Sequence, residues 1–214
     1  MEQRSAPEFI LEAFADPTSV RDVVRGILQT IFFHRFFPSV LPHTREVLDL
    51  TLPYVADAEL ETMIDQRTAT LVRQLDAERG AQQHHATAAG NGGGRGQIMV
   101  QFFEKKRRKT WLIRGDEEVC WECWTVKVTV AEPRTESGPR REIQTDSMCL
   151  PTERAKVRKA MEQTLLAAIM KIVTFANTHK DHIPPITTTE ANPFPYQITV
   201  NQKETGWATR MGIY

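Results

Sequence analysis

The sequence has few cysteines and no long apolar run. Its 214 residues include three cysteines, an odd number that argues against a disulfide framework. No apolar stretch approaches the roughly 18 residues that a membrane-spanning helix needs. The first residues also lack the basic and apolar segments of a secretory signal. We therefore expect a cytoplasmic protein whose thiols are reduced.

The sequence also lacks an excess of charge of either sign. Lysine and arginine together number 27, as do aspartate and glutamate, so the formal net charge is zero. This balance argues against a protein whose main role is to bind nucleic acid or an anionic membrane. A hydrophobic fraction of 41% at this length predicts one globular domain over residues 1–214.

Motifs for catalysis and cofactor binding are missing as well. The glycine-rich stretch matches neither of the common phosphate-binding glycine patterns, and no G-x-S-x-G nucleophile motif occurs. We expect no enzyme activity, no cofactor and no metal site. Cys120 and Cys123 have C-x-x-C spacing, but residues three apart on a strand point to opposite faces, which favours structural thiols. His179 and His182 are interpreted as capping or surface residues.

Hydrophobic periodicity predicts an α+β fold with three helices and a mostly antiparallel sheet. Helical spacing of apolar residues begins after Asp16-Pro17 and recurs over 57–79 and 152–177. Alternating apolar residues predict strands at 47–54, 97–104, 119–130 and 196–200. Three segments are expected to be loops: the flexible glycine-rich 80–96, an exposed connection at 105–118, and 132–150.

The connection at 105–118 is the most informative segment for function. It opens with five basic residues, 105–109, and continues with Trp111, Leu112 and Ile113. Because five consecutive charges are not buried, we expect this apolar trio on an exposed loop, where it has the composition of a binding anchor. Two alternatives stay open: Trp111 folds back onto the domain, or the basic run contacts phospholipid or RNA.

Three strings resemble the autophagy-related protein 101 family, the small HORMA-domain subunits of the autophagy-initiation kinase complex. They are LQTIFFHR at 28–35, GQIMVQFFEKK at 96–106 and, above all, WECWTVKV at 121–128. The similarity extends from about Val20 to Val200. It implies a non-catalytic HORMA domain, with three helices packed on a mostly antiparallel sheet and a mobile C-terminal segment.

The resemblance also implies partners and sites. It implies a heterodimer with the HORMA domain of autophagy-related protein 13, within the initiation kinase complex at the preautophagosomal structure. Trp111 matches the tryptophan of a finger loop that recruits downstream autophagy factors, with Leu112 or Ile113 at the position of the family's phenylalanine. For the dimer contact on the long helix, the candidates are Leu166, Val173 and Phe175. No nucleic acid is expected, and at most peripheral membrane contact; the alternative is a lipid- or nucleic-acid-binding module that uses 105–109.

Overall fold

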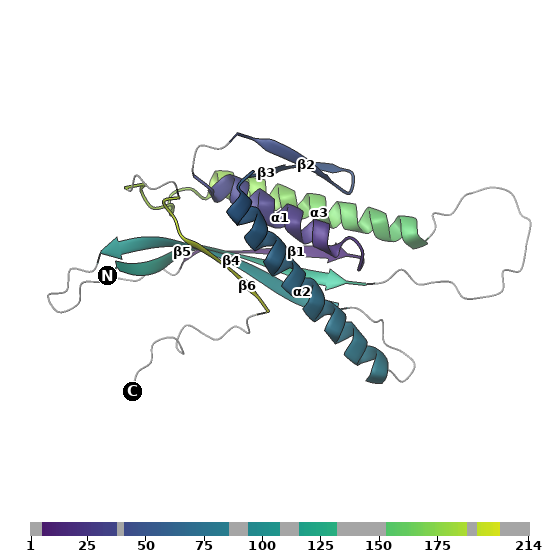
Figure 1. Cartoon of the computed structure of the whole chain (residues 1–214). Helices are drawn as coiled ribbons and strands as arrows, with labels where there is room; N and C mark the ends of the chain where they lie inside the picture. Colours follow the sequence, from purple (N-terminus) through teal and green to yellow (C-terminus); the bar gives the residue numbers. More distant parts are fainter. Residues whose placement is uncertain are drawn as a thin grey trace, which may run out of the picture.

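The chain folds as three helices against a mostly antiparallel sheet, which confirms the predicted α+β class (Figure 1). The computed structural model describes residues 6–37, 41–85, 94–107, 116–131, 153–187 and 192–201. In chain order the elements are β1 (Glu8–Ala15), α1 (Val20–Arg35), β2 (His43–Val47), β3 (Leu50–Tyr54), α2 (Ala58–His85), β4 (Gly94–Arg107), β5 (Asp116–Val130), α3 (Glu153–Thr178) and β6 (Tyr196–Val200). The arrangement is consistent with a HORMA-like fold.

The main sheet has the strand order β1-β5-β4-β6, and β2 and β3 form a separate two-stranded sheet. The pairs β5–β4 and β4–β6 are antiparallel, whereas β1 runs parallel to β5. All three helices contact the sheet or each other on one side: α3 packs on β1, α2 packs on β4 and β6, and α1 lies between α2 and α3 (Figure 1). Alternate strand residues fill the core beneath them: Phe9, Leu11, Ile98, Val100, Phe102, Trp124, Val126, Val128 and Ile198.

Asp16 determines where the central helix α1 begins, and Gly26 determines how closely the β2–β3 hairpin packs on it. The Asp16 carboxylate accepts hydrogen bonds from the backbone N–H groups of Thr18 and Ser19 at 3.0 and 2.7 Å, which fixes the turn before the helix. Gly26 then allows the β2–β3 hairpin to approach closely, since a Cβ atom there would lie 2.9 Å from Leu52 Cδ1. The hairpin is therefore packed directly on α1.

Two strand predictions differ from the structure. The strand β1 was not predicted. Its buried residues Phe9, Leu11 and Ala13 alternate with Ile10 and other outward-facing residues, but because Ile10 is itself apolar the alternation is obscured in the sequence. The predicted single strand at 47–54 is instead the end of β2, a turn and β3. Leu48 has φ 52°, a left-handed conformation that reverses the chain there.

The loops are shorter than expected. The helix α2 continues to His85 and β4 starts at Gly94, so ordered elements occupy both ends of the glycine-rich 80–96 segment. Likewise β4 runs to Arg107 and β5 starts at Asp116, so strand residues occupy both ends of the segment 105–118 that was expected to be a loop. Residues 86–93, 108–115 and 132–152 lie outside the described part of the chain. None of the described helices has the length and hydropathy needed to span a membrane.

Candidate interaction surfaces

The strands β4 and β5 continue past the rest of the sheet as a two-stranded arm, formed by residues 103–107 and 116–120. These residues pair with one another and with neither β1 nor β6. In the arm, Lys105 lies opposite Glu118, and Lys106 lies opposite Glu117. Opposite charges at directly facing positions attract across an antiparallel pair. The start of the basic run is therefore part of a strand and is balanced by the acidic start of β5.

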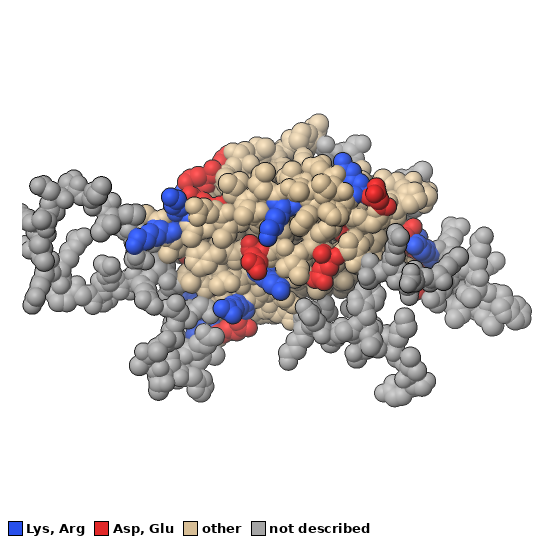
Figure 2. Space-filling model, turned by 180° about the vertical axis from the view of Figure 1, so that it is seen from behind, with Lys and Arg blue, Asp and Glu red and all other residues tan. Residues whose placement is uncertain are grey.

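One face of the described surface carries mixed charge. In the view from behind, Lys and Arg are interspersed with Asp and Glu, and neither sign dominates that face (Figure 2). This agrees with the zero net charge of the sequence. Trp111, Leu112 and Ile113, the predicted binding residues of the connection, lie outside the described residues.

A β-bulge at the base of the arm changes which way the cysteines point. The register shifts between Phe102 and Phe103, and Trp121 is the extra residue of β5. Cys120 is consequently opposite Phe103 and Cys123 is opposite Gln101, which places both thiols on the same face of the sheet. The prediction of opposite faces is wrong, because the bulge adds one residue between them.

The two thiols sit in surroundings that suppress their reactivity. Burial raises the pKa of Cys120, and burial followed by the nearby Glu8 carboxylate raises the pKa of Cys123 to about 12. Both groups are protonated at neutral pH, unlike reactive or metal-binding thiolates. Among the described residues, no three His, Cys, Asp or Glu side chains are grouped as metal ligands.

A buried ionic cluster centred on Glu122 joins three parts of the chain. Its carboxylate has no exposed surface and accepts hydrogen bonds from Arg35 Nε at 2.8 and 3.0 Å and from the Trp124 indole N–H. The His182 Nε2 atom lies 2.7 Å from the other carboxylate oxygen. Arg35 also donates to the His179 carbonyl at 3.4 Å. The cluster thus fastens the end of α1 and the segment after α3 to β5.

This cluster was missed in the sequence, where His182 was interpreted as a capping or surface residue. In the structure His182 contacts a buried carboxylate, and its ring centroid lies 5.7 Å from that of Trp121. The signal that was available is a charged residue, Glu122, inside an otherwise apolar strand. Such a residue needs a partner when it is buried.

The outer face of α3 presents apolar side chains to solvent. Leu166 is 47% exposed and Met170, one turn later, is 56% exposed. Val173 is half-buried and follows them on the same stripe, because positions four and seven residues apart share a helix face. Large exposed side chains that are contiguous in this way are typical of protein interaction surfaces.

Phe175 does not share this stripe. It lies two residues beyond Val173, about 200° further around the helix, and points toward β1. Its ring stacks on Phe9 with a centroid distance of 5.0 Å and lies 5.7 Å from the His179 ring. Of the three predicted contact residues on α3, the structure therefore groups Leu166 with Val173 and places Phe175 in intramolecular packing.

The comparisons with known proteins all give the same family. The family model described as autophagy-related protein 101 matches residues 12–190. A protein of that name from Arabidopsis thaliana is 26% identical over 186 residues, covering 85% of this chain and 80% of the relative. The Schizosaccharomyces pombe protein is 26% identical over 188 residues, covering 88% and 83%. The Homo sapiens protein is 24% identical over 184 residues, covering 84% and 75%.

Proposed function

The chain belongs to the autophagy-related protein 101 family, and from that premise we propose that it is a non-catalytic adaptor of autophagy initiation. It pairs with the HORMA domain of autophagy-related protein 13 and joins the initiation kinase complex. It recruits downstream autophagy factors through the connection that contains Trp111. It works in the cytoplasm and at the preautophagosomal structure.

The observation that carries the pairing proposal is the exposed apolar stripe of α3. Leu166, Met170 and Val173 supply the apolar centre, and polar residues such as Gln163 and Asn177 supply a rim. We leave Phe175 out of the contact, because its ring is used in packing on Phe9. The Arg158 guanidinium, which lies 2.8 Å from Asp49 Oδ1, joins α3 to the β2–β3 turn beside this stripe.

The arm supports the second part of the proposal. Its facing charges at Lys105 and Glu118, and at Lys106 and Glu117, favour the pairing of the two strands up to the connection that carries Trp111, and Lys106 Nζ also lies 3.1 Å from Glu104 Oε2 on its own strand. The same pairs count against the lipid- or nucleic-acid-binding alternative, because cations matched by carboxylates in the same hairpin attract polyanions weakly.

Pairing is tested by light scattering after size exclusion of the full chain mixed with the HORMA domain of autophagy-related protein 13. We expect a one-to-one complex with the wild type. Leu166→Asp and Met170→Asp should weaken it at least about tenfold, because each buries a charge in the centre of the interface. Ile186→Asp is the matched control, since Ile186 is an exposed apolar residue, 54% accessible, that lies outside α3.

Two results decide the pairing proposal. An intact complex with both α3 variants would show that the partner binds elsewhere, and no complex with the wild type at micromolar concentration would overturn the pairing itself. Thermal melting of each variant alone separates loss of contact from loss of folding.

Recruitment is tested separately with Trp111→Ala. We expect unchanged melting and an unchanged complex with autophagy-related protein 13, together with loss of downstream factors from a pull-down. A large fall in melting temperature would show instead that Trp111 is packed in the core. Trp121→Ala provides the contrast, because Trp121 is buried at the bulge and its loss should destabilise the fold.

A further inference from the structure

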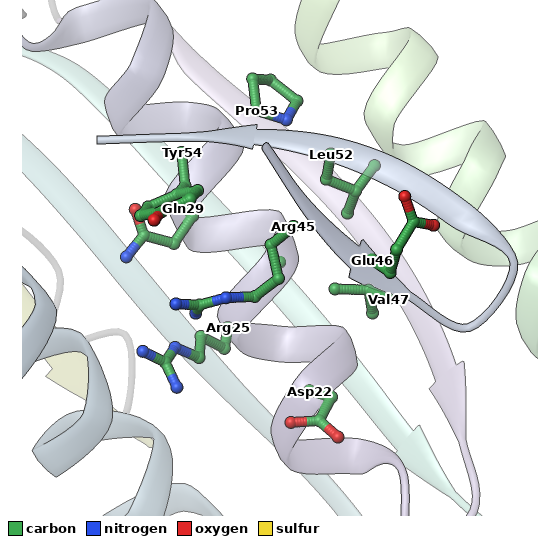
Figure 3. Close-up of a pocket in the computed structure, with 10 residues that line it drawn as sticks. Asp22, Arg25, Gln29, Arg45, Glu46, Val47, Leu52, Pro53 and Tyr54 are labelled. Atoms are coloured by element: carbon green, nitrogen blue, oxygen red, sulfur yellow. The ribbon is translucent and has the colours of Figure 1, made fainter. Parts of the chain in front are cut away.

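A small cavity lies where the β2–β3 hairpin packs on α1 (Figure 3). Its volume is about 40 Å³, and its lining includes Arg25, Gly26 and Gln29 of α1 with Arg45 and Tyr54 of the hairpin. A single water needs roughly 10–15 Å³ of such volume. The cavity therefore holds a group of a few atoms, far less than a drug-sized ligand.

Gln29 presents a hydrogen-bond donor to this cavity that nothing in the described chain accepts. The side chain is only 2% exposed. Its Oε1 accepts the backbone N–H of Val55 at 3.3 Å, and this bond fixes the orientation of the amide. The Nε2 atom is buried and has no acceptor among the described residues. A buried N–H₂ group without a partner costs about 1–3 kcal/mol, so the site favours an occupant that supplies an oxygen.

Arg45 presents a second donor of the same kind. Its guanidinium lies over the Tyr54 ring at 4.8 Å, and its Nη2 lies 3.6 Å from Glu61 Oε2. Its Nη1 is buried and has no hydrogen-bond partner in the described part of the chain. Tyr54 and Glu61 hold this guanidinium in place, so the unpaired Nη1 N–H is positioned before a ligand binds.

Arg25 completes one wall of the site and is itself paired. Its Nη2 donates a hydrogen bond to Glu61 Oε2 at 3.2 Å, whereas its Nε lies 3.2 Å from Asp65 Oδ1 at an ion-pair distance without the geometry of a hydrogen bond. In Figure 3 the nitrogen-bearing ends of Gln29, Arg45 and Arg25 point to the same side, away from Leu52 and Val47. The donors therefore lie on one side of the site, and the Arg45 side chain is 34% exposed, so the site reaches the surface.

The charges around the cavity select a neutral ligand. The two guanidinium groups are balanced by the carboxylates of Glu61 and Asp65, and Asp22 and Glu46 also line the pocket. An anionic carboxylate or phosphate would meet N–H donors but also this excess of negative charge. A carbonyl oxygen uses the same donors without that repulsion.

We propose that this cavity binds a peptide-type carbonyl, from the backbone or an amide side chain of a protein partner, through Gln29 Nε2 and Arg45 Nη1. The small volume admits the carbonyl group while the rest of the partner lies over the hairpin and the start of α2. The site is separate from the α3 stripe and from the arm, and the inference does not depend on which protein occupies either surface.

The test is an NMR titration of the ¹⁵N-labelled full chain with N-methylacetamide as the carbonyl probe. We expect the side-chain amide signals of Gln29 to shift and saturate, whereas those of Gln66, exposed on α2, follow only the solvent change. Gln29→Glu keeps the oxygen that accepts the Val55 N–H but removes the N–H₂ donor. It should weaken probe binding at least about tenfold, followed at the backbone N–H signal of Val55 because the variant has no Gln29 amide signals. Thermal melting checks that the variant still folds with this carboxylate buried.

Arg45→Met is the second variant, because it removes Nη1 while its side chain still covers the Tyr54 ring. It should weaken probe binding by a similar factor. No saturable shift of Gln29, or equal binding by both variants, would overturn the proposal and leave a site filled by water only. Tighter binding of acetate than of N-methylacetamide would overturn it as well, since the site would then recognise anions.

Discussion

The Nε atom of Arg35 lies 2.8 Å from Oε1 of Glu122, in a site where the arginine is 3% exposed and the glutamate is completely buried. This pair joins the last residue of α1 to the middle of β5. Because both charges have left water, each depends on the other for compensation. His182 and Trp124 add contacts to the same carboxylate.

Removing one member of this pair should destabilise the fold strongly. Glu122→Gln preserves the size of the side chain but leaves the Arg35 charge buried without its carboxylate. We expect the free energy of unfolding in denaturant to fall by about 3–5 kcal/mol. Glu78→Gln, an exposed change of the same kind on α2, should alter it by less than about 0.5 kcal/mol. Similar small effects from both variants would mean that Glu122 is compensated by other groups.

Two glycines in helices should respond in opposite directions to alanine. Gly26→Ala places a Cβ 2.9 Å from Leu52 Cδ1 and 3.3 Å from Val47 Cγ2, so the hairpin must move away from α1. The expected cost is about 1–3 kcal/mol. Gly80→Ala meets nothing within 4 Å and should stabilise α2 by about 0.5 kcal/mol. Chemical denaturation of both variants checks this, and a stable Gly26→Ala protein would show that the hairpin yields easily.

Cys123 should make stability fall at alkaline pH. Its pKa is raised to about 12 in the folded protein, chiefly by burial, against an ordinary value of 9.0. Below pH 9 the thiol is protonated in both states and its full contribution is present. As the pH rises from about 9 to about 12, the unfolded chain loses the proton first, which favours unfolding. Cys123→Ala should show a smaller loss of stability over this range than the wild type does.

The same shift predicts low chemical reactivity. At pH 8 iodoacetamide should modify Cys123 far more slowly in the native protein than after denaturation, because thiolate is scarce and the side chain is buried. Peptide mass spectrometry identifies the modified cysteine. Rapid modification of native Cys123 would contradict both the burial and the raised pKa.

Sequence reasoning predicted the elements whose pattern is local. The alternation in β5 and the apolar stripe of α3 each lie within a single segment, so the predicted strand at 119–130 and the predicted helix at 152–177 agree with the structure. The strand β1 was missed because Ile10 and Phe14, on its other face, are also apolar and obscure the alternation of Phe9, Leu11 and Ala13. The β-bulge could not be predicted from the sequence either. Trp121 is the extra residue in the strand pairing, and it packs against Phe102 and Phe194, which lie in other segments.

The candidate sites also include features that follow from local spacing and features that depend on tertiary contacts. The spacing of Leu166 and Val173 places them on one helix face, and the same helix geometry puts Phe175 on another face. Its packing on Phe9 of β1 could be seen only in the structure. Gln29 carries no pattern of its own, because its free donor arises only when Val55 of another segment binds its oxygen. Local spacing therefore predicts faces, and tertiary contacts decide which polar groups remain unpaired.

The facing charges of the arm give a prediction that separates the adaptor from a membrane-binding module. Glu117→Gln with Glu118→Gln removes the carboxylates that lie opposite Lys105 and Lys106, whereas the ion pair of Lys106 with Glu104 at 3.1 Å remains. The lower negative charge of the arm should increase its binding to vesicles rich in phosphatidylserine, measured by co-sedimentation at low salt, and added salt should abolish the gain. The wild type should bind such vesicles only weakly.

The matched control carries the same change of charge elsewhere. Glu59→Gln with Glu78→Gln removes two exposed carboxylates from α2 and should leave vesicle binding near that of the wild type. An equal gain in vesicle binding by both double variants would show that the effect depends on net charge alone. Strong vesicle binding by the wild type, lost on Lys105→Gln with Lys106→Gln, would mean that the cations of the arm act on membranes despite their neighbouring carboxylates. The balance of charges across β4 and β5 predicts the opposite, because each exposed lysine of the arm already faces a glutamate.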